Sequence, residues 1–185
     1  MRLLLAAMWV GWLVYWAIAA RGAKAMQWRE PLSANWLHYT LAWLGTIVLV
    51  VPRATPAILA GRFLPPSPIG AGLGVFLTAL GLGIAIAARI TLAGNWSAAV
   101  EIKEDHALIR RGPYRYVRHP IYSGILLALL GSAIALDRWR ALLGLVLIFG
   151  ALLLKARHEE KELRRVLPGY DAYASKTAVL IPFLF

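Results

Sequence analysis

Two segments of the sequence hold most of the side chains that could take part in chemistry. The first, residues 106–124, is rich in arginine, tyrosine and histidine and contains the run Arg118-His119-Pro120. The second, residues 155–173, carries the adjacent carboxylates Glu159 and Glu160 among several cations. Together they offer positive charge, negative charge and aromatic rings, so we treat them as the candidate site.

The first segment is predicted to lead into a helix. Pro120 suits the first helical turn, because its missing N–H needs no partner there, and this puts His119 near the N-cap. The N–H groups and the dipole of a helix start favour an anion such as a carboxylate. Tyr114, Tyr116 and Tyr122 add flat faces and hydroxyl groups. The segment can therefore form a pocket for a ligand with an aromatic ring and a carboxylate. An ordinary basic, aromatic loop before a helix has the same composition.

The second segment reads as the polar end of a long helix. Lys155 and Glu159 are four residues apart and share one helix face. A solvated helix extension with weak ion pairs is the usual meaning of such a run. Here, however, the run begins at an expected membrane surface, where a carboxylate costs free energy unless it is paired or used.

Other kinds of site are not indicated by the sequence. The chain has no cysteine, which excludes disulfides and thiolate ligands. The residues His106, His119, His158 and Glu159 lack the spacing of a histidine metal motif, so we expect no metal site. There is no phosphate-binding loop and no serine nucleophile motif. A transporter would carry charges near mid-bilayer or a repeated architecture, and neither is found.

The elements that must position these segments are predicted to be membrane helices. Of the 185 residues, 60% are hydrophobic and 16% are charged, whereas a soluble domain is nearer half apolar and a quarter charged. This composition excludes a soluble enzyme and a disordered chain. Five apolar runs occur, at Leu3–Ala20, Trp36–Val51, Ile69–Leu92, Ile121–Leu136 and Ala141–Leu154. We therefore expect an all-α integral membrane protein, a single membrane domain over residues 1–185, with about five transmembrane helices.

The last two runs are expected to form a hairpin around the polar turn at residues 137–140. Their outer ends carry the two chemical segments, so a hairpin brings the candidate site together. Arg89 is the only cation well inside an apolar run, and we expect it to reach outward to the membrane surface.

The distribution of positive charge predicts the orientation. The net charge is +11, and 14 Lys and Arg residues lie in the connections that would share one side, against five on the other. Cytoplasmic loops carry the excess of positive charge. This places residues 93–120 and 155–185 in the cytoplasm and the N-terminus outside. It also explains the basic composition through anionic lipid rather than nucleic acid.

At this point the two segments resemble a known family. Gly112-Pro-Tyr-Arg-Tyr-Val-Arg-His-Pro-Ile-Tyr-Ser-Gly124 resembles the Gly-x-Tyr…Arg-His-Pro-x-Tyr-x-Gly signature of the isoprenylcysteine carboxyl methyltransferase family. Glu159-Glu160-x-x-Leu163 and the run from Leu167 to Tyr173 are similar to the tail of that family, with Leu167 in place of a phenylalanine and one residue fewer. The resemblance covers residues 106–182. Phospholipid methyltransferases and some sterol-type reductases carry similar C-terminal patterns.

The resemblance implies a helical membrane enzyme that uses S-adenosyl-L-methionine in a pocket at the cytoplasmic face. The cofactor contacts that it implies are His106, Ala107, Leu108, Ile109, Tyr114, His119, Pro120, Ile121, Tyr122, Glu159 and Glu160. In this interpretation the helix start and His119 receive the methionine carboxylate and Glu159 holds the ammonium group. Tyr114 or Tyr122, with Leu108 and Ile109, lines the adenosine.

The methyl acceptor is less defined. Family members that act on prenylcysteine carboxylates have an arginine where this chain has Lys155, and Arg157 follows on another helix face. Lysine neutralises a carboxylate but cannot bind it in the bidentate manner of arginine. Lys155, Arg157 and Glu159 are the candidate catalytic residues.

We expect carboxyl O-methylation of a prenylcysteine-like or other lipidic carboxylate that enters from the bilayer. A lipid amine or small thiol acceptor, a nicotinamide-dependent membrane reductase and a non-catalytic binding protein remain alternatives. The short chain is typical of a prokaryotic cytoplasmic membrane protein.

Overall fold

The protein is built mainly from helices. The computed structural model describes residues 1–22, 26–29, 36–51, 56–96, 101–103 and 108–182. Within these ranges the α-helices are α1 (Arg2–Ala20), α2 (Trp36–Val50), α3 (Pro68–Leu92), α4 (Pro120–Leu136), α5 (Trp139–Val166) and α6 (Tyr170–Ala174). Short 3-10 helices occupy η3 (Ala57–Ala60), η4 (Ala93–Asn95) and η5 (Gly112–Arg115).

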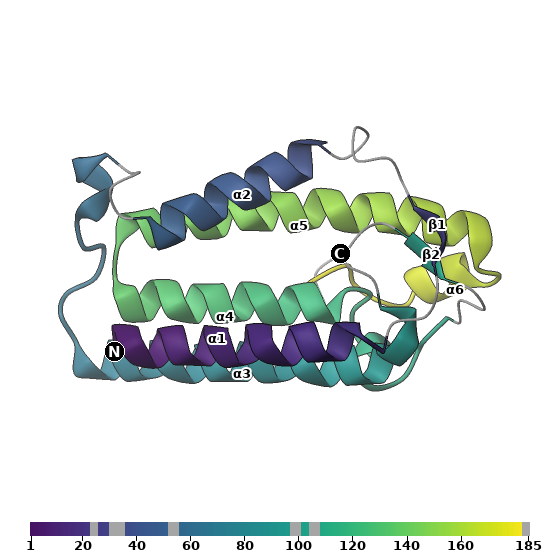
Figure 1. Cartoon of the computed structure of the whole chain (residues 1–185), viewed down its shortest axis with the longest axis horizontal. Coiled ribbons are helices and arrows are strands. Elements are labelled where there is room, and N and C mark those ends of the chain that lie inside the picture. The colour runs from purple at the N-terminus through teal and green to yellow at the C-terminus, as the bar shows by residue number, and fades with distance from the viewer. Residues whose placement is uncertain (23–25, 30–35, 52–55, 97–100, 104–107, 183–185) are drawn as a thin grey trace.

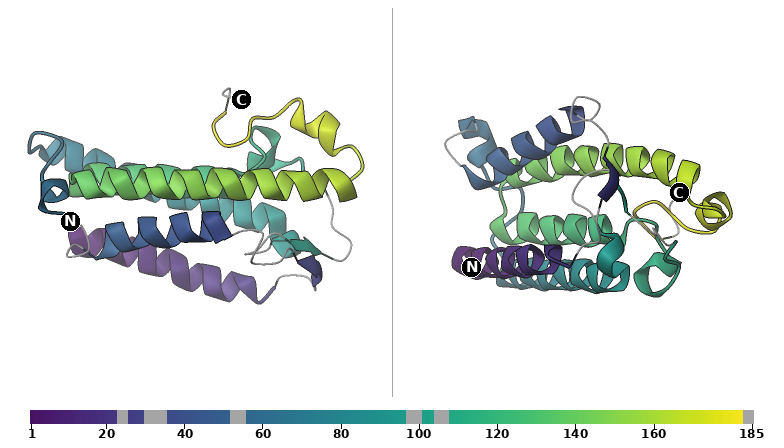
Figure 2. Two further views of the ribbon diagram at one scale, coloured as in Figure 1. Left: turned by 90° about the horizontal axis from the view of Figure 1, so that it is seen from above. Right: turned by 45° about the vertical axis from the view of Figure 1, so that its right-hand side comes forward.

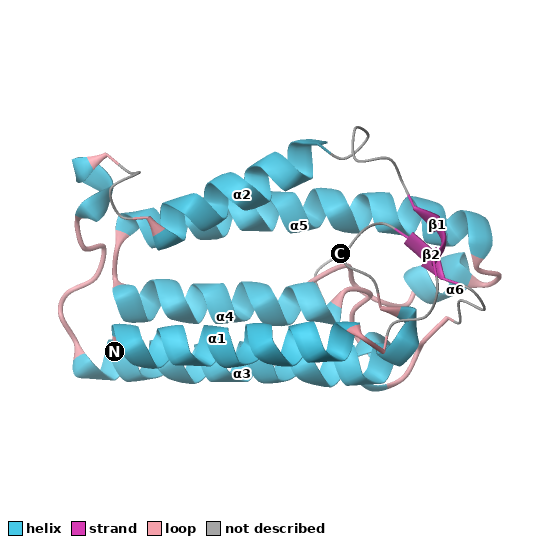
Figure 3. Ribbon diagram, viewed as in Figure 1, coloured by secondary structure: helices cyan, strands magenta, loops and turns pink. Residues whose placement is uncertain are grey.

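One small element departs from the all-α prediction. Strand β1 (Met26–Arg29) pairs antiparallel with β2 (Glu101–Lys103), with Arg29 opposite Glu101 and Met26 opposite Lys103 (Figure 3). Strands of three or four residues are too short to show a period-2 pattern of hydrophobicity, so the sequence did not predict them. The ribbon joins the connection after α1 to the connection after α3.

Among the residues that the structure describes, three stretches of helix are long and apolar enough to cross a membrane. They are α1, the helix that continues from α3 through η4 over Pro68–Asn95, and α5. The apolar helices α2 and α4 are shorter, at 15 and 17 residues. Helix α5 has 28 residues and runs without a break from the last apolar run into the polar segment that ends at Val166. The chain is therefore an integral membrane protein by the length and composition of its helices.

The long helices lie in two groups (Figure 1). One group contains α1, α3 and α4, and the other contains α2 packed on α5, as the further views also show (Figure 2). Helices α3 and α4 touch through glycines: a Cβ atom at Gly81 would lie 2.5 Å from the carbonyl oxygen of Gly124, and one at Gly74 would lie 2.6 Å from that of Gly131. Without a hydrophobic force between helices in lipid, such close backbone approach supplies the packing energy.

The turn between α4 and α5 is fixed by Asp137. This residue adopts a left-handed conformation, with φ of 49°, and its carboxylate accepts backbone N–H groups from Leu64 at 2.7 Å and Phe63 at 3.1 Å. Arg62 Nε lies 2.6 Å from the same carboxylate. The turn is thus tied to the connection between α2 and α3, and α4 and α5 return the chain to the end where the candidate residues lie (Figure 1).

Arg89 does not reach outward as the sequence suggested. Its side chain is buried near the end of α3, where Nη2 donates to the carbonyl oxygen of Ala19 and Nη1 to that of Ala93, each at 2.6 Å. The guanidinium also lies over the ring of Trp96, 4.6 Å from its centroid. A cation is favourable beside the free carbonyls of a helix end, so Arg89 links the ends of α1 and α3.

We predict that Gly81→Ala destabilises the protein, because the added methyl group meets backbone of α4. Overpacking of this kind costs about 1–3 kcal/mol. The midpoint of thermal unfolding in detergent should fall accordingly. Gly83→Ala, on the same helix, is the matched control, since a Cβ atom there meets nothing within 4 Å. Equal midpoints for the two variants would contradict the proposed role of the glycine contact.

Candidate functional site

The start of α4 is held by the C-terminal part of the chain. Pro120 occupies the first turn and is fully buried, with His119 at the N-cap as expected. Residues 174–180, which we call the C-terminal strap, run along the segment before α4. The backbone N–H of Arg118 donates to Ala178 at 2.8 Å and that of His119 donates to Val179 at 3.1 Å. The strap therefore fixes the backbone that presents both side chains.

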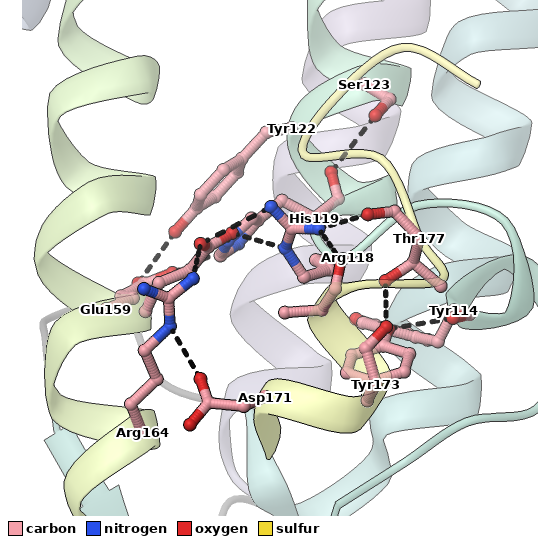
Figure 4. Close-up of polar contacts among 12 residues, drawn as sticks. Tyr114, Arg118, His119, Tyr122, Ser123, Glu159, Arg164, Asp171, Tyr173 and Thr177 are labelled. Carbon is pink, nitrogen blue, oxygen red and sulfur yellow. Dashed lines mark hydrogen bonds and ion pairs between the residues drawn. The ribbon is translucent and has the colours of Figure 1, made fainter. Parts of the chain in front are cut away.

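The imidazole of His119 lies between two carboxylates of α5 (Figure 4). Its Nδ1 is 3.5 Å from Glu159 Oε2, and its Nε2 is 3.3 Å from Glu160 Oε1. The ring stacks on Tyr122 with the planes only 1° from parallel and the centroids 5.3 Å apart. One buried side chain thus joins the start of α4 to the polar end of α5.

Glu159 has further partners on the side of Tyr122. The Tyr122 hydroxyl donates to Glu159 Oε1 at 2.7 Å, and Lys155 Nζ lies 3.6 Å from the same oxygen. Lys155 also lies over the Tyr122 ring, 5.5 Å from its centroid. The Lys155–Glu159 pair expected from their spacing is therefore present, and both side chains are largely buried.

Glu160 is paired with a different cation. Arg118 Nε lies 2.6 Å from Glu160 Oε1, and Arg118 Nη1 donates to the strap carbonyls of Ala174, at 2.8 Å, and Thr177. From the solvent side Arg164 lies 3.6 Å from Glu160 Oε2, as a surface ion pair. The adjacent carboxylates therefore have separate sets of partners, apart from the shared imidazole.

The carboxylates determine the charge of His119. Burial lowers the pKa of His119, but hydrogen bonds to Glu159 and Glu160 and the negative charges of both outweigh it, so the pKa is raised above 6.5. The protonated imidazolium is favoured because it can donate to both carboxylates at once. The site thus places two buried carboxylates on either side of the His119 ring.

Apolar side chains lie beside this polar cluster. Tyr114 is buried against Ala88 and Ile121, and Ile109 packs on the same group. Leu108 packs instead against Leu167, Tyr170 and Tyr173. The Tyr173 hydroxyl donates to the carbonyl oxygen of Tyr114 at 2.7 Å, which ties α6 to η5.

The structure brings together some of the predicted residues and separates others. His119, Tyr122, Lys155, Glu159 and Glu160 form one connected cluster. Tyr114, Pro120, Ile121, Leu108 and Ile109 are buried or partly buried around the start of α4 and η5. His106 and Ala107 lie outside the described residues.

Arg157 does not join the cluster. It is exposed on another face of α5, so the structure does not bring it together with Lys155 and Glu159, the other two expected catalytic residues. The reason is helical geometry: two residues turn the helix by about 200°, so Arg157 cannot share the face of Lys155 and Glu159.

Arg118 is the residue that sequence reasoning missed. In the sequence it was noted only as part of the Arg-His-Pro run, and no ion-pair partner was assigned to it. The signal was the second glutamate, because two adjacent carboxylates beside a membrane require more than one cation.

The arrangement can bind a zwitterion. Glu159 provides a carboxylate for an ammonium group, while the N–H groups at the start of α4, beside the His119 ring, can receive a carboxylate. The first backbone hydrogen bond of α4 runs from the N–H of Ser123 to the carbonyl oxygen of His119, at 3.1 Å. The N–H groups of Ile121 and Tyr122 come before this bond and therefore have no acceptor within the helix. The aromatic residues add flat surfaces beside both charges.

Comparison with known proteins identifies a family. A family model described as the isoprenylcysteine carboxyl methyltransferase (ICMT) family matches residues 73–165, half of the chain. The matched range includes most of α3, all of α4 and nearly all of α5, and it contains the cluster around His119. A comparison with curated proteins finds no match.

We predict that the contribution of His119 to stability is lost as pH rises. The folded pKa is raised above the unfolded value of 6.5, so the contribution is fully present below 6.5 and disappears as pH passes through the folded pKa. The measurement is the difference in free energy of unfolding between wild type and His119→Gln in detergent, from pH 6 to pH 9. Above neutrality this difference should shrink. A difference that grows with pH would mean that His119 is neutral in the folded protein.

Proposed function

Because the chain belongs to the isoprenylcysteine carboxyl methyltransferase family, a family of membrane methyltransferases, we propose that it methylates a hydrophobic acceptor with S-adenosylmethionine. The observation that carries the proposal is the buried cluster in which His119 joins the start of α4 to Glu159 and Glu160. It offers opposite charges for the amino-acid part of the cofactor within a few ångströms of each other.

The residues of the site fit this cofactor. We assign Glu159 to the ammonium group, and the start of α4 with His119 to the carboxylate. Tyr114, Tyr122, Leu108 and Ile109 are assigned to the adenosine. Glu160, Pro120 and Ile121 complete the surroundings, and His106 and Ala107 are assigned by resemblance. S-adenosylmethionine, when bound, supplies an electrophilic methyl group on a sulfonium centre.

The protein has little acid–base work if the acceptor is a carboxylate. Such a nucleophile is already an anion, so the chain must bind it, orient it and exclude water. Lys155 is the cation that we assign to the acceptor, because it lies in the cluster whereas Arg157 is exposed. A lipid amine or small thiol is the second candidate acceptor. It is favoured by the lysine at this position, which cannot bind a carboxylate in a bidentate manner.

We place this chemistry at the cytoplasmic face. We propose that α2 and α4 cross the bilayer together with the three longer apolar helices. In this arrangement α4 and α5 form a hairpin. Support comes from the distribution of charge along the sequence, since 14 of the 20 Lys and Arg residues lie in the segments expected on the cytoplasmic side. Anionic cytoplasmic lipid favours that side, which leaves the N-terminus outside.

Calorimetric titration of S-adenosylhomocysteine into the detergent-purified protein tests the proposal, with NADPH as the parallel ligand. We expect binding of S-adenosylhomocysteine and none of NADPH. Binding of NADPH alone would assign the protein to reductases. A folded protein that binds neither would exclude both activities and leave a non-catalytic membrane protein. For the acceptor, an ester methyl product is labile to base, whereas N-methyl and S-methyl products are stable.

Glu159→Gln should weaken binding of S-adenosylhomocysteine about 10- to 100-fold, the value of one charge-assisted hydrogen bond. The variant keeps the shape of the side chain and loses the charge that pairs with an ammonium group. Glu162→Gln is the matched control on the same helix, because Glu162 pairs with Arg165 at 2.8 Å. Wild-type affinity in Glu159→Gln would remove Glu159 from the binding site.

Lys155→Arg should raise turnover of a prenylcysteine carboxylate about 3- to 10-fold, because arginine adds a second hydrogen bond to the carboxylate. The readout is radiolabelled methyl transfer that is released by base. Lys161→Arg, at an exposed position of α5, serves as the control. Unchanged turnover in Lys155→Arg would indicate that Lys155 does not face the acceptor.

A further inference from the structure

Arg118 is bound on every side of its guanidinium within the site. Nε and Nη2 face the two oxygens of Glu160, at 2.6 and 3.4 Å, and Nη1 donates to the strap carbonyls of Ala174 and Thr177. Its side chain is only 9% exposed. Because two backbone carbonyls and one carboxylate hold the guanidinium, it cannot turn away toward solvent or toward a ligand.

The position of Glu160 explains why such a cation is needed. Glu159 and Glu160 both contact the imidazole of His119, at 3.5 and 3.3 Å, in a largely buried place. Two buried carboxylates that share one cation repel each other and compete for it. A charge left without a partner in such surroundings costs far more than a surface charge.

We propose that Arg118 is a positioning residue that pairs with Glu160 inside the site, so that the carboxylate of Glu159 remains available for the ammonium group of the cofactor. This inference rests on the proposed function and deepens it, since it assigns different tasks to two adjacent glutamates. Glu159 faces Tyr122 and Lys155 and binds the ligand. Glu160 faces Arg118 and the strap and holds the imidazole in place.

A second arginine on the same carboxylate provides the comparison. Arg164 lies 3.6 Å from Glu160 Oε2, but its side chain is 49% exposed and it also pairs with Asp171 at 3.4 Å. Water screens this pair, and exposed pairs of this kind contribute little. Removal of either arginine deletes one positive charge next to Glu160, yet only the removal of Arg118 leaves the carboxylate without its buried partner.

The test is the affinity for S-adenosylhomocysteine of four proteins: wild type, Arg118→Gln, Arg164→Gln and the double variant Arg118→Gln/Glu160→Gln. We expect Arg118→Gln to lose at least about tenfold in affinity, and Arg164→Gln to stay close to wild type. In the double variant the carboxylate that needed neutralising is gone, so most of the affinity should return. The coupling between the two substitutions assigns the loss to the Arg118–Glu160 pair, and the thermal unfolding midpoint of each variant separates a loss of affinity from a loss of stability.

Several outcomes would overturn the inference. They are wild-type affinity in Arg118→Gln, equal losses in the two arginine variants, and a folded double variant that binds no better than Arg118→Gln. If Arg118→Gln does not fold, the double variant still tests the inference, because its two neutral side chains leave no unpaired charge at this position. Its affinity for S-adenosylhomocysteine should then approach that of wild type. If wild type itself binds no S-adenosylhomocysteine, the proposed function fails instead. Thermal unfolding of each variant without ligand establishes that it is folded.

Discussion

The contact of His119 with two carboxylates is the interaction on which the site depends. It joins His119, the residue directly before α4, to Glu159 and Glu160 of α5, which lie about forty positions further along the chain. Each partner alone would be costly to bury at this place. Together with Arg118, Lys155 and Tyr122 they satisfy one another, which allows charged groups to remain beside an apolar bundle.

The remainder of the fold keeps the start of α4 beside the turn of α5 that carries Glu159 and Glu160. The glycine contacts of α3 with α4 fix the depth of α4 in the bundle, and the turn at Asp137 fixes its other end relative to α5. At the functional end, the strap holds the backbone that presents Arg118 and His119, and α6 holds η5 beside it through Tyr173.

A membrane setting gives this design a physical reason. Methyl transfer to an anionic acceptor needs alignment and exclusion of water more than proton transfer. In the proposed function, a helical bundle with its polar cluster at one end would meet both needs, because a water-soluble cofactor would approach from the aqueous side and a hydrophobic acceptor from the lipid. The excess of positive charge in the segments expected on the cytoplasmic side favours the same arrangement.

The sequence determined the parts of this protein that depend on local physics. Apolar runs long enough for helices predicted α1 to α5, Pro120 predicted the start of α4, and the spacing of Lys155 and Glu159 predicted their shared face. The motif around His119 and the glutamate pair indicated the family that the comparison shows.

Tertiary structure alone decided which distant groups meet. The pairing of Arg118 with Glu160, the burial of Arg89 against the end of α1, and the strap on the start of α4 join residues from about 40 to 70 positions apart. No periodicity encodes such contacts, because they arise from the packing of whole helices. The position of Arg157 depends on both. Helical rotation puts Arg157 on a different face of α5 from Lys155 and Glu159, and the packing of α5 against its neighbours leaves that face exposed.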